Sequence, residues 1–178
     1  MHVWIKRLEL TDFRNYESFV LEPAESLTVL LGPNAVGKTN VVEAIELVTE
    51  TSSFRNPAWS DLVRVGADRA IVSMRAESDA GSRTDIVLAV ENGRRAYRVN
   101  GTAKRSVIDA AGQVPAVVFT PDDLRIIKEA ADRRRAAVDS VGLQVSRAYA
   151  QLKTEYDRVL RQRNALLREG EANDAETG

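Results

Sequence analysis

The sequence predicts an α/β protein in which a mixed sheet with an antiparallel meander is followed by a long helical arm. Residues 32–39 read GPNAVGKT and match the phosphate-binding pattern G-x-x-x-x-G-K-[ST] at every fixed position. Short alternating runs, separated by turn-forming residues, come after this stretch. An almost unbroken helical pattern then fills the C-terminal part of the chain.

Three strands are predicted ahead of the helix that follows the glycine loop. Residues 3–8 alternate between apolar and polar types, which indicates a half-buried strand ending near Asp12. Residues 16–21 indicate a second strand, and the apolar run 27–31 a third, buried strand that leads into the glycine loop. Two strands, a connection and a further strand favour a mixed sheet over a wholly parallel one.

The glycine loop has the residue types that a nucleoside triphosphate and its metal require. Gly32 and Gly37 let the backbone curl so that its N–H groups point inward, and the helix start adds its positive dipole end. Lys38 can reach the β and γ phosphates, and the Thr39 hydroxyl can bind a bridging Mg²⁺. Pro33 lacks an N–H group and cannot donate to the phosphates.

A helix is predicted to begin at the end of this loop. Val41, Ile45 and Val48 recur at helical spacing, with Glu43 and Glu46 on the other side. Strand, glycine loop and helix in this order are the context that the motif requires. The predicted nucleotide-binding residues of the loop are Gly32, Pro33, Asn34, Ala35, Val36, Gly37, Lys38, Thr39 and Asn40.

Composition narrows the class of protein further. The chain has 178 residues, a formal net charge of −1 and no cysteine, which predicts one domain with a core and excludes disulfides and thiolate metal sites. The near-zero charge does not decide for or against nucleic acid. Lys6, Arg7 and Glu9 interrupt the N-terminal stretch, so it lacks the apolar core of a signal peptide, and no apolar run approaches a membrane span. A cytoplasmic protein without membrane association is expected.

An antiparallel meander is predicted from three alternating runs, at residues 70–76, 84–90 and 96–99. Asp79-Ala80-Gly81, Glu91-Asn92-Gly93 and Asn100-Gly101 are turn signals that follow these runs in order. A further apolar run, Val114 to Phe119, ends at Thr120-Pro121-Asp122-Asp123, which can cap a helix starting near Leu124.

The helical pattern from residue 122 is interrupted only by Gly142 before Gly170. Within it a seam steps by four and three residues, through Val145, Tyr149, Leu152, Tyr156, Val159, Arg163 and Leu166. This seam favours a coiled-coil arm and an amphipathic helix packed on the domain about equally. Residues 170–178 are polar and are expected to be disordered. The predicted organisation is therefore a head lobe at 1–121, a helical arm at 122–169 and a tail at 170–178.

Seven stretches in order resemble one family. They are FRNY (13–16), GPNAVGKTN (32–40), EAI (43–45), SFR (53–55), VFTPDDL (118–124), RRR (133–135) and QRNALL (162–167). Together they resemble the RecF family of bacterial recombinational repair, ABC-type ATPases related to SMC proteins. The resemblance covers residues 1 to about 168 and the N-terminal half of a typical member.

The resemblance implies an ATP-binding, DNA-binding protein of DNA replication, recombinational repair and the SOS response. ATP with Mg²⁺ would bind at residues 32–40, with Arg14 and Asn15 beside the nucleotide. In complete members ATP would join two copies around single-stranded, gapped or duplex DNA, with RecO- and RecR-type mediators as partners. The arginines 133–135 could face DNA phosphates or form a solvated or internally paired helix face, and the sequence leaves this open.

Two elements that ATP hydrolysis requires are not found in the sequence: a second strand ending in a carboxylate, the Walker B strand, and a signature loop. Ile86 to Glu91 ends in an acid but runs into Asn92-Gly93, so it indicates one arm of a hairpin. In the family both elements lie in the C-terminal half, so this chain is expected to hydrolyse ATP poorly or not at all, and no catalytic residue is assigned. The alternatives are another SMC-like or defence ATPase head, a small P-loop kinase and a non-hydrolysing docking fragment.

Overall fold

The computed structural model places the chain as two compact units, Met1–Glu129 and Ala130–Gly178. It describes residues 2–50, 52–104, 113–120 and 131–176. The predicted helix start near Leu124 lies outside these ranges.

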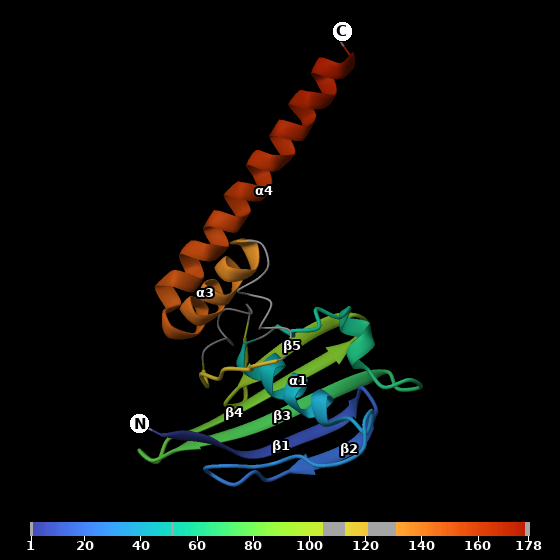
Figure 1. The fold of residues 1–178 in the computed structure, drawn as a ribbon, viewed down its shortest axis with the longest axis vertical. Helices are drawn as coiled ribbons and strands as arrows, with labels where there is room; N and C mark the ends of the chain where they lie inside the picture. Colours follow the sequence, from blue (N-terminus) through green and yellow to red (C-terminus); the bar gives the residue numbers. More distant parts are fainter. Residues whose placement is uncertain (1, 51, 105–112, 121–130, 177–178) are drawn as a thin grey trace. The chain divides into compact units, whose positions relative to one another are not determined.

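The first unit is built on one six-stranded sheet. Its strands are β1 (Val3–Phe13), β2 (Tyr16–Leu21), β3 (Arg69–Ser78), β4 (Arg83–Glu91), β5 (Arg94–Val99) and β6 (Thr102–Lys104). They lie in the order β2-β1-β3-β4-β5-β6 (Figure 1). The α/β class and the meander are confirmed. Every pairing in the described strands is antiparallel, so the mixed sheet expected from the sequence has no parallel pair there.

Local turn chemistry explains the meander. Asn92 and Gly93 both have positive φ, 50° and 68°, between the paired residues Glu91 and Arg94. The next turn repeats the arrangement, with Asn100 at 49° and Gly101 at 77°. Asparagine and glycine tolerate this left-handed backbone better than other residues, and two-residue turns of this kind match the twist of the strands they join.

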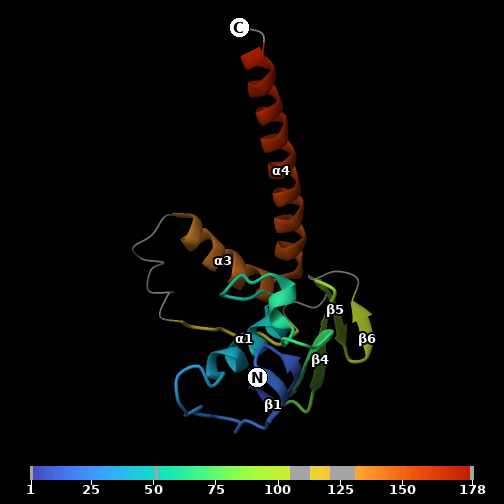
Figure 2. The same ribbon diagram turned by 90° about the vertical axis from the view of Figure 1, so that its right-hand side faces the viewer.

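Helix α1 (Lys38–Thr49) covers one face of the sheet (Figure 2). Alternate residues of β1, β3 and β4 point to this face, and they form the core together with the apolar side of α1. The buried Tyr97 of β5 joins the two layers, because its hydroxyl donates to the carbonyl oxygen of Leu47 at 3.0 Å. Burial raises the pKa of Tyr97 to about 12.

The apolar run 27–31 does not form the buried strand that the sequence predicts. Leu27, Val29 and Leu31 are 74%, 64% and 87% exposed, and the run belongs to no strand. Leu30 alone of the run's leucines packs against the core. A strand requires a neighbour for its backbone groups, and no described strand lies beside this run. The run is extended apolar chain with an uncovered side.

Residues 114–119, a second apolar segment near the glycine loop, also form no strand and leave large apolar side chains exposed. Val114 is buried in the core, whereas Val117 and Phe119 are 87% and 72% exposed. No strand is formed in this segment either.

The second unit contains α3 (Ala131–Val145) and α4 (Arg147–Glu176). The sequence indicates one pattern interrupted at Gly142, but the helices separate at Ser146, whose side-chain oxygen caps α4 by accepting the Tyr149 N–H at 3.2 Å. A Cβ at Gly142 would lie 2.6 Å from the Tyr149 ring, so glycine lets that ring pack closely. Helix α4 continues through Glu176, where a disordered tail was expected from residue 170.

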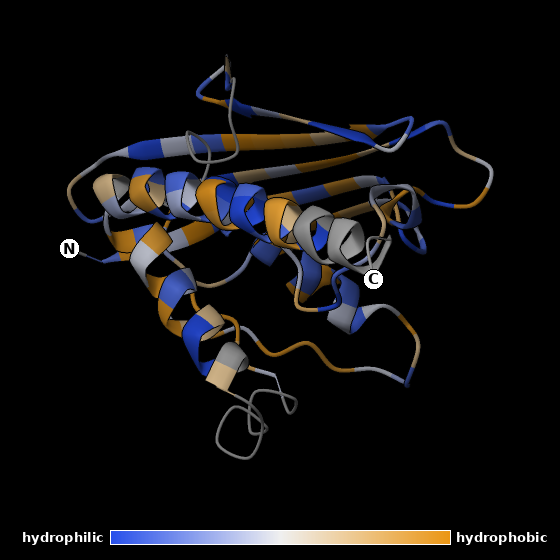
Figure 3. Ribbon diagram, turned by 90° about the horizontal axis from the view of Figure 1, so that it is seen from above, coloured by the Kyte–Doolittle hydropathy of each residue, from blue (hydrophilic) through white to orange (hydrophobic). Residues whose placement is uncertain are grey.

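Apolar and polar residues alternate around α4 (Figure 3). Leu152, Tyr156, Val159 and Leu166 of the predicted seam are all exposed within the described part of the chain. No helix in the described ranges combines the length and the apolar character needed to cross a bilayer.

Candidate nucleotide-binding site

The glycine loop between residue 31 and α1 is held in a curl that few residue types adopt. Gly37 has φ 113°, and a Cβ there would lie 2.7 Å from the Tyr16 hydroxyl and 2.9 Å from the Asn15 amide nitrogen. Glycine is therefore required both by the backbone angle and by close packing against the β1–β2 turn. Ala35 also has a positive φ, 64°, which is strained for a residue with a side chain.

Positive charge and free donors converge on this curl. The Lys38 ammonium donates to the carbonyl oxygens of Gly32 and Pro33, at 2.7 and 2.6 Å, so it lies across the loop. Helix α1 begins at Lys38, and its first N–H groups have no acceptor within the helix. Together with the helix dipole they make the loop a site for an anion such as phosphate.

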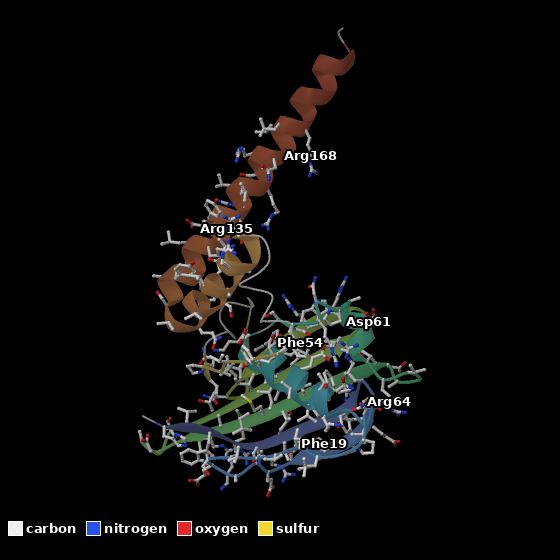
Figure 4. All side chains as sticks on the ribbon, in the orientation of Figure 1. Phe19, Phe54, Asp61, Arg64, Arg135 and Arg168 are labelled. Atoms are coloured by element: carbon white, nitrogen blue, oxygen red, sulfur yellow. The ribbon has the colours of Figure 1, made fainter. Side chains whose placement is uncertain are left out.

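A cavity of about 750 Å³ opens beside the loop. Its lining residues are Leu30, Lys38, Thr39, Val42, Phe54, Arg55, Phe119 and Thr120. Phe54 lies next to α1 in the side-chain view (Figure 4). The cavity thus combines two cations and two hydroxyl groups with an apolar wall, and its volume is in the range of small-molecule sites.

The cavity suits a magnesium ion that arrives with a nucleotide. Thr39 is exposed and offers a hydroxyl oxygen, the hard ligand type that Mg²⁺ prefers. The described lining contains no carboxylate, and the described residues include no group of three metal-ligating side chains. Mg²⁺ needs few protein ligands when phosphates and water complete its shell, so these residues fit a nucleotide-borne ion.

Behind the loop, a fully buried carboxylate joins two arginines from distant segments. Glu43 of α1 is 0% exposed. Arg14 of the β1–β2 turn binds it through two parallel bonds, Nη2 to Oε1 at 2.7 Å and Nε to Oε2 at 3.0 Å. Arg55 donates to Oε2 at 2.9 Å and the Ser53 hydroxyl to Oε1 at 2.7 Å. We call Arg14, Glu43, Ser53 and Arg55 the Glu43 cluster.

The charges in the Glu43 cluster keep the carboxylate ionised. Burial alone would raise the pKa of Glu43, but the hydrogen bonds from Arg14 and Ser53 and the charges of Arg14 and Arg55 outweigh it and hold the pKa below its ordinary value. Four donors satisfy both carboxylate oxygens, which is the condition under which a buried charge is tolerated.

The sequence-based expectation for the polar side of α1 was wrong. Glu43 and Glu46 were placed on the side away from the apolar residues, yet both are buried. Glu46 accepts the backbone N–H of Phe54 at 2.8 Å, so it fixes the start of the segment that carries Arg55. The two carboxylates, one turn apart, bind the 53–55 segment onto α1.

Residues 4–124 match the family described as the RecF/RecN/SMC N terminal domain. The chain belongs to this family. Two relatives named DNA replication and repair protein RecF, from Cutibacterium acnes and Beutenbergia cavernae, are 39% and 40% identical over 99% and 93% of the chain. The chain spans 46% and 42% of these relatives, so slightly less than half of their length.

Solved structures agree with the RecF-type assignment. The structure described as the recombination mediator protein RecF-ATPrS in the RecFOR pathway matches 94% of this chain and 45% of its own, with a TM-score of 0.88 and 31% identity. The corresponding RecF-ATP structure matches with a TM-score of 0.85 over 93% of this chain. The head-lobe fold expected from the sequence is therefore the fold of the N-terminal part of RecF.

In this RecF-type lobe, the predicted loop residues 32–40 lie together, while the two turn residues have other partners. The three nitrogens of the Arg14 guanidinium bind Glu43 and the carbonyl oxygen of Asp61 in η1 (Trp59–Leu62). Asn15 donates to the Val36 carbonyl oxygen at 3.0 Å. Contact of Arg14 and Asn15 with a nucleotide stays a prediction.

Sequence analysis missed Glu43, Phe54 and Arg55 as site residues. The signal was present, because EAI and SFR are among the stretches shared with the RecF family, and the opposite charges of Glu43 and Arg55 are complementary. The arginines 133–135 belong to α3 in the other unit, where Arg134 and Arg135 are exposed and have interactions of their own. Their contact with DNA also stays a prediction.

Proposed function

We propose that the chain binds ATP with Mg²⁺ as the nucleotide-binding lobe of a RecF-type protein. The observation that carries this is the curl at Gly37, which turns the loop around the Lys38 ammonium at the start of α1. The family membership and the likeness to RecF structures with ATP ligands support the same proposal.

Each residue has a distinct role in this proposal. Lys38 exchanges its two carbonyl acceptors for phosphate oxygens, so its charge is in place before the ligand arrives. Thr39 would hold the Mg²⁺, which would supply charge neutralisation for the phosphates. The described cavity lining holds no carboxylate to orient water, so this chain by itself binds ATP without efficient hydrolysis.

The name of the relatives, DNA replication and repair protein RecF, supports a wider role. In a complete RecF-type protein, ATP would join two heads on gapped or duplex DNA, and RecO- and RecR-type mediators would act with them. This role on the chromosome is consistent with a cytoplasmic location.

Titration with a fluorescent ATP analogue tests the binding proposal. Saturable binding that requires Mg²⁺, and that is lost in Lys38→Ala, is expected, while Thr39→Ala should weaken the Mg²⁺ dependence. Lys6→Ala removes an exposed lysine of β1 and should leave the affinity unchanged. Absence of saturable binding by folded wild-type protein, or equal binding by Lys38→Ala, would overturn the proposal.

A separate titration tests the DNA proposal. Binding of a gapped duplex by a full-length RecF-type protein should weaken steeply as the salt concentration rises. The same binding should strengthen when ATP and Mg²⁺ are present. Binding that is independent of ATP in a full-length RecF-type protein would contradict the proposed coupling.

A further inference from the structure

A line of side-chain hydrogen bonds runs from the middle of the glycine loop to Arg55. Asn15 Nδ2 donates to the Val36 carbonyl oxygen at 3.0 Å. Asn40 Nδ2 donates to Asn15 Oδ1 at 2.8 Å, and Arg55 Nη1 donates to Asn40 Oδ1 at 2.6 Å. We propose that Asn15 and Asn40 are positioning residues that couple the shape of the loop to the placement of Arg55.

We call the hydrogen-bonded line from Val36 through Asn15 and Asn40 to Arg55 the amide relay. The chemical groups at its two ends fix the direction of every hydrogen bond in it. A guanidinium can only donate, so the Asn40 oxygen must face Arg55 and its nitrogen must face Asn15. A backbone carbonyl can only accept, so the nitrogen of Asn15 must face Val36 and its oxygen must face Asn40. Neither amide can flip without breaking two bonds, and the relay therefore specifies one arrangement.

The relay holds the loop by a tether that a nucleotide does not displace. Lys38 also ties the loop, but in the proposed function it gives up Gly32 and Pro33 when it turns to phosphate. The donor of the Asn15 bond to Val36 is a neutral amide, which a phosphate attracts much less than the Lys38 ammonium, so this bond can persist in the bound state. The tethered segment includes Ala35 at φ 64°, a strained backbone that needs support from its surroundings.

The other end of the relay is Arg55, which lines the cavity and uses only part of its hydrogen-bonding capacity. Arg55 Nη1 binds Asn40 and Glu43, whereas its Nε and Nη2 groups have no hydrogen bond among the described residues. Its side chain is 36% exposed, lines the cavity with Lys38 and Thr39, and lies over the Phe54 ring at 5.4 Å. Asn40 and Glu43 thus aim the guanidinium while leaving donors available to an anion.

This inference rests on the proposed ATP binding, and a set of combined variants tests it. Affinity for the fluorescent ATP analogue with Mg²⁺ is measured for Asn15→Ala, Arg55→Ala and the double variant. Each single change should weaken binding about tenfold, the effect of losing one or two of the hydrogen bonds that hold the site. Because the relay joins them, the double variant should lose markedly less than the product of the two single losses.

The decisive comparison repeats these variants with Asn40→Ala. Asn15 and Arg55 make no direct hydrogen bond, so removing Asn40 cuts the side-chain path of the relay, and the two losses should move close to multiplicative. The coupling that remains runs through Glu43, which binds both Arg55 and Arg14. Arg64→Ala, which breaks an ion pair with Asp12 and does not line the cavity, should combine multiplicatively with Asn15→Ala in both backgrounds. Multiplicative losses with Asn40 intact would overturn the relay.

Hydrogen exchange supplies a second readout without nucleotide. Asn15→Ala and Asn40→Ala should both speed amide exchange at residues 35–37 while β3 stays protected, which shows that the fold is intact. Unchanged exchange in the loop would overturn the relay even if ATP binds. Failure of the wild-type protein to bind ATP would instead overturn the proposed function, so the two failures are distinguishable.

Discussion

The two sides of the glycine loop differ in how far the rest of the chain covers them. On the side of the β1–β2 turn, the carboxylate of the Glu43 cluster is buried, and each of its oxygens has two donors. On the other side, the run 27–31 and the segment 117–119 leave large apolar side chains exposed. One side of the site is thus completed by this chain, and the other remains an open apolar surface.

The difference shows which groups of the site need their partners within the same lobe. A buried charge without partners costs several kcal/mol in order-of-magnitude terms, so the Glu43 cluster requires all its donors on the same folded unit. Exposed apolar chain has no such requirement, because water tolerates it at a smaller cost. The matched RecF chain is more than twice as long, since this chain covers 45% of it.

The largest expected effect compares two leucines, one in the core and one in the open run. Leu47 of α1 is 1% exposed, and Leu47→Ala should lower the free energy of unfolding by about 3 to 4 kcal/mol through lost burial and a cavity. Leu31→Ala should change it by less than about 0.5 kcal/mol. Urea unfolding measures both, and a large loss at Leu31 would show that this run is covered in solution.

Glu43→Gln tests the closed side. The new amide nitrogen would face donors of Arg14 or Arg55, and a partly buried arginine would lose its counter-charge, which should cost about 3 kcal/mol of stability. Glu17→Gln on the exposed side of β2 is the matched control and should be neutral. If both variants unfold alike, the Glu43 cluster does not hold the turn and α1 together.

Acid provides a reversible version of the same test. The folded-state pKa of Glu43 lies below its ordinary value of 4.5, so the stabilisation is complete above that value and is lost as the pH falls through the lower folded-state pKa. Below about pH 4.5 the wild-type protein should therefore lose stability more steeply than Glu43→Gln. The stability of both proteins should keep some dependence on acid because of Asp85. Burial would raise the pKa of Asp85, but its hydrogen bonds and ion pairs with Arg75 and Arg83 lower it.

The comparison also separates what could be predicted from the sequence and what could not. The meander was predictable because Asn92-Gly93 and Asn100-Gly101 determine their turns locally. The curl of the glycine loop was predictable because it depends on a local requirement, a residue without a side chain at Gly37.

Features that depend on distant segments were not predictable. Helical spacing places Glu43 on a polar side, and only the approach of Arg14 and Arg55 explains its burial. The β-prone run 27–31 has strand composition, but strand formation depends on a neighbour that composition does not reveal. The separation of α3 from α4 depends on the Ser146 cap and the packing of Tyr149 on Gly142.

The smallest expected effect concerns the strain in the loop itself. Ala35 has a left-handed backbone, which costs an alanine about 1 kcal/mol, whereas glycine adopts it freely. Ala35→Gly should therefore raise the free energy of unfolding by about 0.5 kcal/mol, after the greater entropy of glycine in the unfolded chain offsets part of the gain.

The same substitution at Ala44, in the right-handed backbone of the buried side of α1, should act in the opposite direction and cost at least about 1 kcal/mol. Urea unfolding with the two variants side by side isolates the backbone term, because both changes remove one methyl group. A loss of stability at position 35 would mean that the Ala35 methyl group contributes more than the strain it imposes. The curl would then be held by packing as well as by the Asn15 tether.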